Sequence, residues 1–231
     1  MVYHSFIHVT GIYFFTKGFL LTRLVLDSKS TCAIPPIAPS TAFKGAGTPE
    51  GGCWHPKTFS KAVVIIIDAL RYDFTVPFNN ISQAGTSDPA PAQAFHNSIP
   101  FLYDTALAEP QNAFLLPFIA DPPTTTLQRL KGLTTGTLPT FIDAGSNFAG
   151  EAIEEDNLLQ QLRDAGRKIV HLGDDTWTAL FPGYFEEEIS RAYDSLNVWD
   201  LHTVDNGVTE HILPLLGKER KEEWDVMVAH F

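Results

Sequence analysis

The sequence predicts an α/β protein built on a parallel sheet that is flanked by helices. Residues 63–67, Val-Val-Ile-Ile-Ile, form an apolar run without polar alternation, which is typical of a strand covered on both faces. Helix-like and strand-like segments then follow one another along the rest of the chain. With 231 residues, of which 44% are hydrophobic, the chain is long enough for one such core.

The first segment, residues 1–26, is predicted to be a signal anchor that crosses a membrane. Its apolar stretch, residues 5–26, has about the ~20 residues that a spanning helix needs. Lys17 and Arg23 lie within this stretch, where each would have to reach a membrane face with its charged end. A buried or amphipathic helix is the alternative interpretation.

Residues 27–60 are predicted to be a linker, and the folded domain is predicted to cover residues 61–231. The linker is rich in proline and glycine, which favours turns. Cys32 and Cys53, which are the two cysteines of the chain, both fall within it. A disulfide between them and two free thiols both remain open.

Three helix-and-strand cycles are predicted within the folded domain. Thr126 is expected at the start of a helix that Gly136 ends, because Leu127, Leu130 and Thr134 share one helical face. The other predicted elements are helices at 101–107, 157–165 and 204–213, and strands at 113–120, 168–172 and 224–231.

The net charge of −11 bears on the class of partner. A nucleic-acid-binding surface needs a basic face, and none is visible in the sequence. We therefore expect no nucleic-acid partner.

Asp68 and Thr126 are the residues best placed for chemistry. Asp68 follows a strand directly, and ligands of parallel sheets gather at the carboxyl ends of strands. At a helix start, the Thr126 hydroxyl can attack a phosphorus atom while backbone amides hold the phosphate oxygens. A zinc-like cation shared with Asp68 would activate that hydroxyl. The alternative is that the threonine only caps a helix and the aspartate only begins a loop.

Two stretches carry a resemblance to a known family. The strand that ends in Asp68-Ala-Leu-Arg and the run Asp121-Pro-Pro-Thr-Thr-Thr, which continues to Asp143, resemble the glycosylphosphatidylinositol (GPI) ethanolamine phosphate transferases of the alkaline phosphatase superfamily. The likeness covers most of residues 61–231. Supporting stretches are 143–147, 155–158, 173–177, 181–183, 203–207 and 224–231.

The resemblance implies roles for individual residues. Asp68 matches a metal ligand, and Thr126 matches the nucleophile, which also contacts the metal. Complete members of the family bind two Zn²⁺ ions. Asn147 is expected to donate its amide to a phosphate oxygen, because a neutral donor stabilises developing charge; the alternative is a turn asparagine.

A second group of residues follows the strand at 168–172. Asp174, Asp175 and Trp177 are candidates for binding the ethanolamine head, because carboxylates and an indole face suit a small cation. A turn at the strand end explains the Gly-Asp-Asp sequence as well.

The implied reaction moves phosphoethanolamine from phosphatidylethanolamine to a mannose, the third, of the GPI precursor through a phosphothreonine-type intermediate. The implied setting is the membrane of the endoplasmic reticulum, with the catalytic domain in the lumen and a small membrane protein as partner.

The resemblance also implies an alkaline-phosphatase-like sheet that is incomplete at the C-terminus. Family members continue past residue 231 to further zinc ligands and membrane spans, so we expect this polypeptide to bind zinc weakly and to transfer little by itself. His230 is expected to be structural. The alternatives are a soluble or anchored phosphodiesterase or phosphatase of the same superfamily, and a catalytically dead membrane-anchored binding module.

Overall fold

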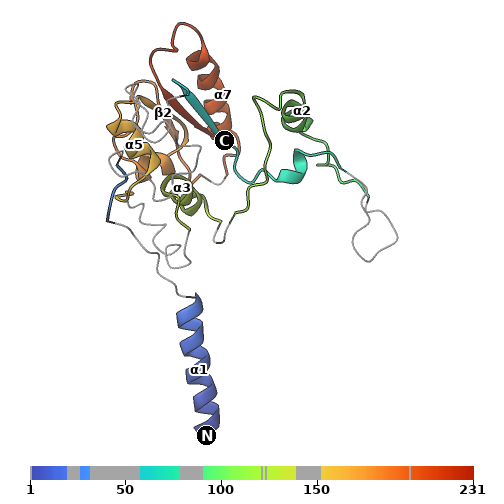
Figure 1. Ribbon diagram of the computed structural model, residues 1–231, viewed down its shortest axis with the longest axis vertical. Helices are drawn as coiled ribbons and strands as arrows, with labels where there is room; N and C mark the ends of the chain where they lie inside the picture. Colours follow the sequence, from blue (N-terminus) through green and yellow to red (C-terminus); the bar gives the residue numbers. More distant parts are fainter. Residues whose placement is uncertain are drawn as a thin grey trace, which may run out of the picture. The chain divides into compact units, whose positions relative to one another are not determined.

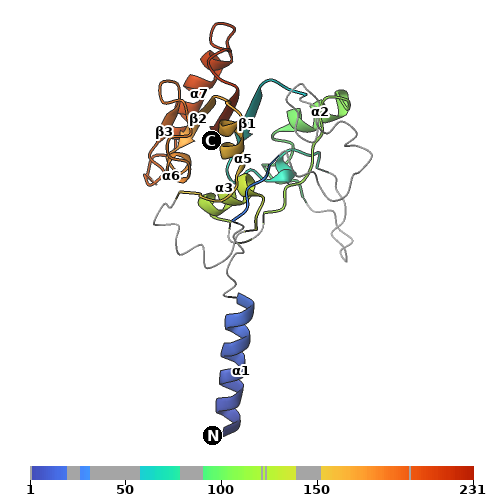
Figure 2. The same ribbon diagram turned by 60° about the vertical axis from the view of Figure 1, so that its left-hand side comes forward.

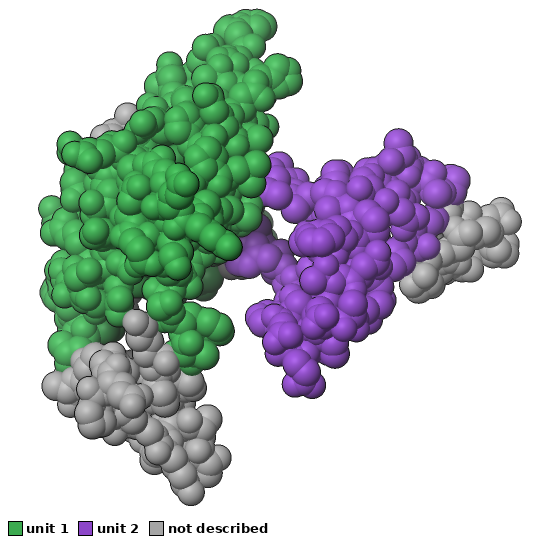
Figure 3. All heavy atoms as spheres, turned by 90° about the horizontal axis from the view of Figure 1, so that it is seen from above, with its two compact units in different colours: residues 1–66, 121–231 green, residues 67–120 purple. Residues whose placement is uncertain are grey.

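The computed structural model describes residues 2–19, 27–31, 58–78, 91–120, 122, 124–138, 152–197 and 199–231. These residues form two compact units (Figure 3). Unit 1 comprises Met1–Ile66 and Asp121–Phe231, and unit 2 comprises Ile67–Ala120. Each unit is described by itself.

Unit 1 contains a parallel sheet, as predicted (Figures 1 and 2). The described part of the chain gives it four strands in the order β1-β4-β2-β3, and every neighbouring pair is parallel. Its strands are β1 (Ala62–Ile66), β2 (Ile169–Asp174), β3 (Arg191–Tyr193) and β4 (Val226–His230).

Helices cover both faces of the two central strands, because the side chains of β2 and β4 point alternately to opposite faces. On one face, Ile169 and Val228 pack in a core with residues of α3, α5 and α6. On the other face, Val170 and Met227 pack in a core with residues of α7. The helices are α3 (Thr126–Thr135), α5 (Leu158–Asp164), α6 (Thr176–Leu180) and α7 (Thr203–Leu216).

The predicted strand at residues 63–67 is present as β1, but the prediction that it is covered on both faces is wrong. β1 lies at an edge of the sheet, with only β4 beside it among the described strands. Helix α7 packs mainly on β2, β3 and β4. The exposed fractions of Val63, Val64 and Ile65 are therefore 39%, 40% and 56%.

The predicted limits of α3 and α5 are confirmed, whereas α7 is longer than the predicted 204–213 at both ends. α3 has Thr125 as its N-cap and ends at Gly136, whose φ of +72° is accessible without strain only to glycine. α5 begins after Asn157, whose side-chain oxygen accepts a hydrogen bond from the backbone amide of Gln160. Two elements, α6 and β3, were not predicted.

Unit 2 contains a short 3-10 helix, η2 (Tyr72–Phe74), and α2 (Pro100–Ala108). α2 confirms the helix predicted at residues 101–107. The strand predicted at residues 113–120 is wrong: the segment has no regular structure, and Phe114, Phe118 and Ile119 are 84%, 68% and 81% exposed. An apolar run becomes a strand only when another strand pairs with it, and Pro117 lacks a donor for such pairing.

The amino-terminal helix, α1 (Val2–Phe19), is confirmed as a helix, but its prediction as a membrane span is not supported. None of the helices in the described residues is long and apolar enough to cross a membrane. His4, His8 and Lys17 reduce the apolar character of α1. Residues 20–26 of the predicted span lie outside the described residues, as do Cys32 and Cys53.

Candidate functional site

Four polar or aromatic side chains, from β2, β4 and α6, lie together in unit 1. Asp174 is the last residue of β2, and His230 is the last residue of β4. The two strands are neighbours, with Leu172 in register with Ala229. Their carboxyl ends therefore lie side by side, at the edge where parallel sheets bind ligands.

His230 is held by an indole. The Nε1 of Trp177, in α6, donates a hydrogen bond of 3.1 Å to Nδ1 of His230. The two rings meet edge to face, with centroids 6.3 Å apart. Both side chains are almost fully buried, with exposed fractions of 2% and 4%. The buried bond fits the structural role predicted for His230.

Asp174 lies on the other side of the same imidazole nitrogen. Its Oδ1 is 3.7 Å from Nδ1 of His230, and its Oδ2 accepts a hydrogen bond of 3.0 Å from the Thr176 hydroxyl. Burial by itself would raise the pKa of the Asp174 carboxyl. The interactions with His230 and Thr176 outweigh burial, so that the pKa of Asp174 lies below its ordinary value.

His171, in the middle of β2, completes the cluster. Its ring is fully buried and lies against Trp177 and Phe185, with ring centroids 5.8 and 5.2 Å apart. Burial lowers the pKa of His171 to about 4, although the carboxylate of Asp174 acts in the opposite direction. The imidazole is therefore neutral at physiological pH. Within the described residues, neither ring nitrogen has a hydrogen-bond partner.

Gly173 allows β2 and β4 to approach at this point. Its φ is +156°, and a Cβ atom placed on it would lie 2.9 Å from both Cβ and the carbonyl oxygen of His230. The same atom would lie 3.1 Å from Nε2 of His171. A glycine is therefore required for β2 and β4 to approach this closely at Gly173.

Asp175 and Trp177 occupy different environments from those expected of a cation-binding pair. The Oδ1 of Asp175 accepts hydrogen bonds from the amide and hydroxyl of Ser195, at 3.2 and 2.5 Å. Asp175 thus ties the loop after β3 to the start of α6. The indole of Trp177 belongs to the core, so its face is covered in this structure. Binding of ethanolamine by Asp174, Asp175 and Trp177 stays a prediction.

Thr126 is the first residue of α3, as predicted, and is half-buried. The preceding N-cap, Thr125, directs its hydroxyl to the side-chain oxygen of Gln128. The α3 N-cap makes no side-chain hydrogen bond to the backbone. The first-turn amides of a helix have no partner within the helix, so they are suited to an anion.

Asp68 lies two residues beyond β1 and belongs to unit 2. Its carboxylate is exposed, and Oδ1 accepts a hydrogen bond of 2.9 Å from the Ala69 amide. Ala69 has φ of +56°, a conformation that residues with a Cβ rarely adopt and that concentrates at functional sites. Convergence of Asp68 and Thr126 on one ion stays a prediction, and Asn147 lies outside the described residues.

The described part of the chain does not by itself form a metal centre. It contains no group of three or more histidine, cysteine, aspartate or glutamate side chains that could hold a metal ion. A carboxylate and a hydroxyl are too few donors for a closed zinc site, which has four ligands.

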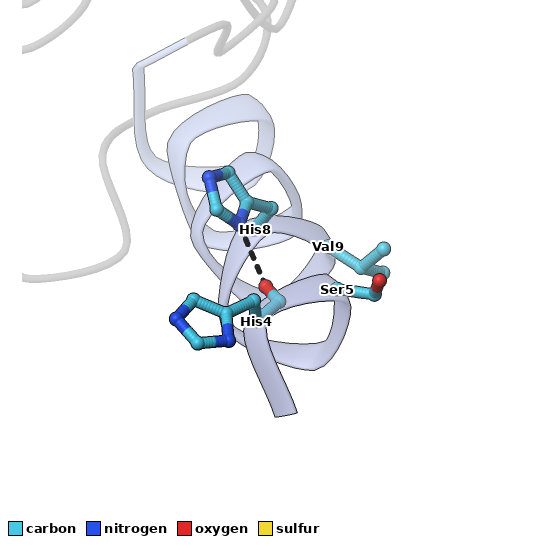
Figure 4. Close-up of a pocket in the computed structure, with 4 residues that line it drawn as sticks. All are labelled: His4, Ser5, His8 and Val9. Carbon is cyan, nitrogen blue, oxygen red and sulfur yellow. Dashed lines mark hydrogen bonds between the residues drawn. The ribbon is translucent and has the colours of Figure 1, made fainter. Parts of the chain in front are cut away.

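A hollow on α1 is the other feature that could suggest a site (Figure 4). It is lined by His4, Ser5, His8 and Val9, and Nδ1 of His8 lies 2.6 Å from the carbonyl oxygen of His4. All four residues come from one helix. Small-molecule sites enclose most of a ligand, so a hollow with a single wall is a poor candidate.

His171 was not predicted to belong to the cluster. It sits in an apolar segment whose pattern shows only a buried strand. A polar residue at a core position is the signal that could have identified it.

Comparison with known proteins identifies relatives along almost the whole chain. No family model matches it, and no solved structure does. GPI ethanolamine phosphate transferase 3 of Schizosaccharomyces pombe is 48% identical over 221 residues, which are 96% of this chain. The chain is homologous to the GPI ethanolamine phosphate transferases. This homology confirms the resemblance found in the sequence.

Other GPI ethanolamine phosphate transferases give the same picture. The catalytic subunit of human transferase 3 is 48% identical over 98% of the chain, whereas that of human transferase 2 is 33% identical over 97%. The chain therefore resembles transferase 3 more than transferase 2 in these comparisons. It spans about a fifth of the length of the relatives, with 22% of the S. pombe protein and 20% of human transferase 3.

Proposed function

We propose that this chain serves in GPI anchor biosynthesis, as a catalytic segment that transfers phosphoethanolamine from phosphatidylethanolamine to the third mannose of the GPI precursor. The observation that carries the proposal is the 48% identity to a GPI ethanolamine phosphate transferase 3 over 96% of the chain. The position of Thr126 as the first residue of α3 supports it.

Thr126 acts as the nucleophile in this proposal. Its Oγ attacks the phosphorus of phosphatidylethanolamine, an Oγ–P bond forms, and diacylglycerol leaves with the proton. A mannose hydroxyl then attacks the same phosphorus, the Oγ–P bond breaks, and the threonine hydroxyl regains a proton. The first-turn amides of α3 supply donors for the phosphate oxygens throughout.

Zinc dependence is part of the proposal, with Asp68 and Thr126 as two of the ligands. The amide hydrogen bond to Oδ1 of Asp68 is compatible with metal binding, because a carboxylate oxygen can accept more than one partner. When bound, zinc supplies Lewis-acid chemistry and lowers the pKa of a coordinated hydroxyl. The remaining ligands come from outside the described residues.

The substrate groups would be bound near the carboxyl edge of the sheet. Asn147 would donate to a phosphate oxygen. Asp174, Asp175 and Trp177 remain the proposed partners of the ethanolamine ammonium. Because the core covers the Trp177 face and Asp175 is bonded to Ser195, the Asp174 carboxylate, with its low pKa, is the member best suited to contact the cation. The proposed setting is the membrane of the endoplasmic reticulum, with the transferase domain in the lumen and a small membrane protein as partner.

Replacement of the matching segment in a relative tests the proposal. The 221-residue region of the S. pombe transferase 3 that matches this chain would be exchanged for it, in cells depleted of their own enzyme. We expect phosphoethanolamine on the third mannose to be restored. Thr126→Ala should abolish transfer and covalent capture of phosphate at this position, and Thr126→Ser should restore both in part.

Thr124→Ala is the matched control, because Thr124 is exposed and lies just before the helix. It should leave transfer within about twofold, since no step involves it. Labelling of Thr126 without transfer to mannose would favour a phosphodiesterase or phosphatase. Transfer that survives Thr126→Ala would overturn the nucleophile, and failure of the replacement with intact folding would favour a dead binding module.

A further inference from the structure

We propose that Trp177 and Asp174 are positioning residues that act through His230: the indole fixes the neutral imidazole with its proton on Nε2, and the Asp174 carboxylate takes over Nδ1 when the ring gains a second proton. The inference depends on the proposed function in one respect, which is that the reaction takes place at the carboxyl edge of the sheet.

The position of the proton on the neutral His230 ring follows from hydrogen-bond chemistry. An indole N–H is a donor only, so Nδ1 of His230 must accept the 3.1 Å bond from Trp177. A neutral imidazole has one donor and one acceptor nitrogen. Because Nδ1 is the acceptor, the proton resides on Nε2. The bond is nearly inaccessible to water, which makes its loss costly.

The exchange of partners on protonation of His230 follows from the position of Asp174. Its Oδ1 is buried, has no hydrogen-bond partner among the described residues, and lies 3.7 Å from Nδ1 of His230. Its Oδ2 is fixed by the Thr176 hydroxyl. When Nδ1 becomes a donor, the indole N–H can no longer bond to it, and Oδ1 of Asp174 is an ionised acceptor 3.7 Å away. The ring therefore exchanges one partner for the other.

Among the described residues of β2, β1 and α6, Asp174 supplies the charge beside His230. The pKa of Asp174 lies below its ordinary value, so the carboxylate is ionised at neutral pH. His171, the other titratable group of β2 at this point, stays neutral because burial lowers its pKa to about 4. β1, in register on the other side of β4, has only apolar residues. At the N-cap of α6, the Asp175 carboxylate is bonded to Ser195.

The arrangement would matter for catalysis because His230 closes β4 at the candidate site. It is in register with Ile66, two residues before Asp68 in the sequence. A ring with one defined tautomer presents a donor of fixed direction, whereas a free ring would interconvert between two. Exchange of partners would change the position of the ring as the pH falls.

Nitrogen-15 NMR of the histidine rings in the 231-residue chain tests this inference without any transfer reaction. At neutral pH, Nδ1 of His230 should give the signal of an unprotonated nitrogen and Nε2 that of an N–H. Trp177→Phe should produce a mixture of both tautomers. Asp174→Asn should keep the wild-type tautomer but make uptake of the second proton less favourable, because a neutral amide stabilises a charged ring less than a carboxylate does.

Trp224→Phe is the matched control, because it also removes a buried indole that donates a hydrogen bond, here to the Leu215 carbonyl. It should leave the His230 signals unchanged. A proton on Nδ1 of His230 in the wild type, or an unchanged tautomer in Trp177→Phe, would overturn the inference. If Trp177→Phe does not fold, the wild-type spectrum and Asp174→Asn decide it. Loss of transfer in Thr126→Ala tests the proposed function separately.

Discussion

β4 and β1 are neighbouring strands of similar composition with very different environments. Val226–His230 is buried at every position, whereas Ala62–Ile66 is exposed at four of five positions. The two strands pair in parallel, with Val64 opposite Val228. β4 has a strand on each side and a core on each face, and β1 has one neighbouring strand in the described part of unit 1.

The difference shows that an apolar sequence specifies a strand more reliably than it specifies burial. Both runs would satisfy the same pattern for a doubly covered strand. Their positions in the strand order decide which of them is covered. The polar cluster of His171, Asp174, Trp177 and His230 lies beside the well-packed pair, β2 and β4, where its geometry is held by neighbours on several sides.

Of the substitutions considered, Gly173→Ala should destabilise the well-packed pair of strands, β2 and β4, the most. The new Cβ would lie 2.9 Å from a backbone oxygen and from the His230 Cβ, and the φ of +156° disfavours any side chain. We expect a loss of about 4 kcal/mol in the free energy of unfolding, the sum of overpacking and backbone strain. Urea unfolding followed by tryptophan fluorescence would measure it.

Gly183→Ala provides the comparison for that loss. Gly183 also has a positive φ, +72°, but a Cβ there meets nothing within 4 Å. The cost should fall to about 1 kcal/mol, from backbone strain alone. Equal losses in the two variants would show that close contact of β2 and β4 is not the reason for the glycine.

The pH dependence of stability should come largely from His171. Below a pH of about 6.5 the unfolded chain protonates this histidine, whereas the folded chain does so only near its lowered pKa of about 4. Unfolding thus takes up a proton, and stability falls as the pH drops from about 6.5 towards 4. The loss should be on the order of 3 kcal/mol.

His171→Phe removes the titrating ring and keeps an aromatic side chain against Trp177 and Phe185. The fall in stability between pH 7 and pH 4.5 should shrink in this variant. The exposed His202 supplies the control, because His202→Gln should retain the wild-type dependence. A pH dependence that survives His171→Phe unchanged would contradict the assignment.

A paired substitution measures the contrast between β4 and β1 directly. Val228, 4% exposed, and Val64, 40% exposed, lie opposite each other. Val228→Ala should cost about 2.5 kcal/mol of unfolding free energy, and Val64→Ala about 1 kcal/mol. Similar losses would mean that β1 is covered in solution by a part of the chain outside the described residues.

The local features were predictable because they depend on neighbouring residues. The start of α3 at Thr126, its end at Gly136 and the cap at Asn157 follow from threonine, glycine and asparagine at known positions. The strand order does not follow from local sequence, so the exposure of β1 was missed. β3 has three residues, which is too short for a recognisable pattern.

The candidate site was predictable in part for the same reason. Asp174 and Trp177 stood out as polar and aromatic residues after a strand, and the structure places them in one cluster. The contact between Trp177 and His230 joins residues 53 positions apart, so only the fold brings them together. The burial of the Trp177 indole, which covers the face expected to bind a cation, is likewise a result of packing.

The segment at residues 113–120 gives the smallest expected effect. It is as apolar as β4, yet Phe118 is 68% exposed and lies in no strand. Because Phe118→Ser removes little buried surface, it should change the free energy of unfolding by no more than about 0.5 kcal/mol, measured by urea unfolding with circular dichroism. A loss as large as that of Val228→Ala would show that this run is buried in solution. The sequence pattern would then have been the better guide to this segment.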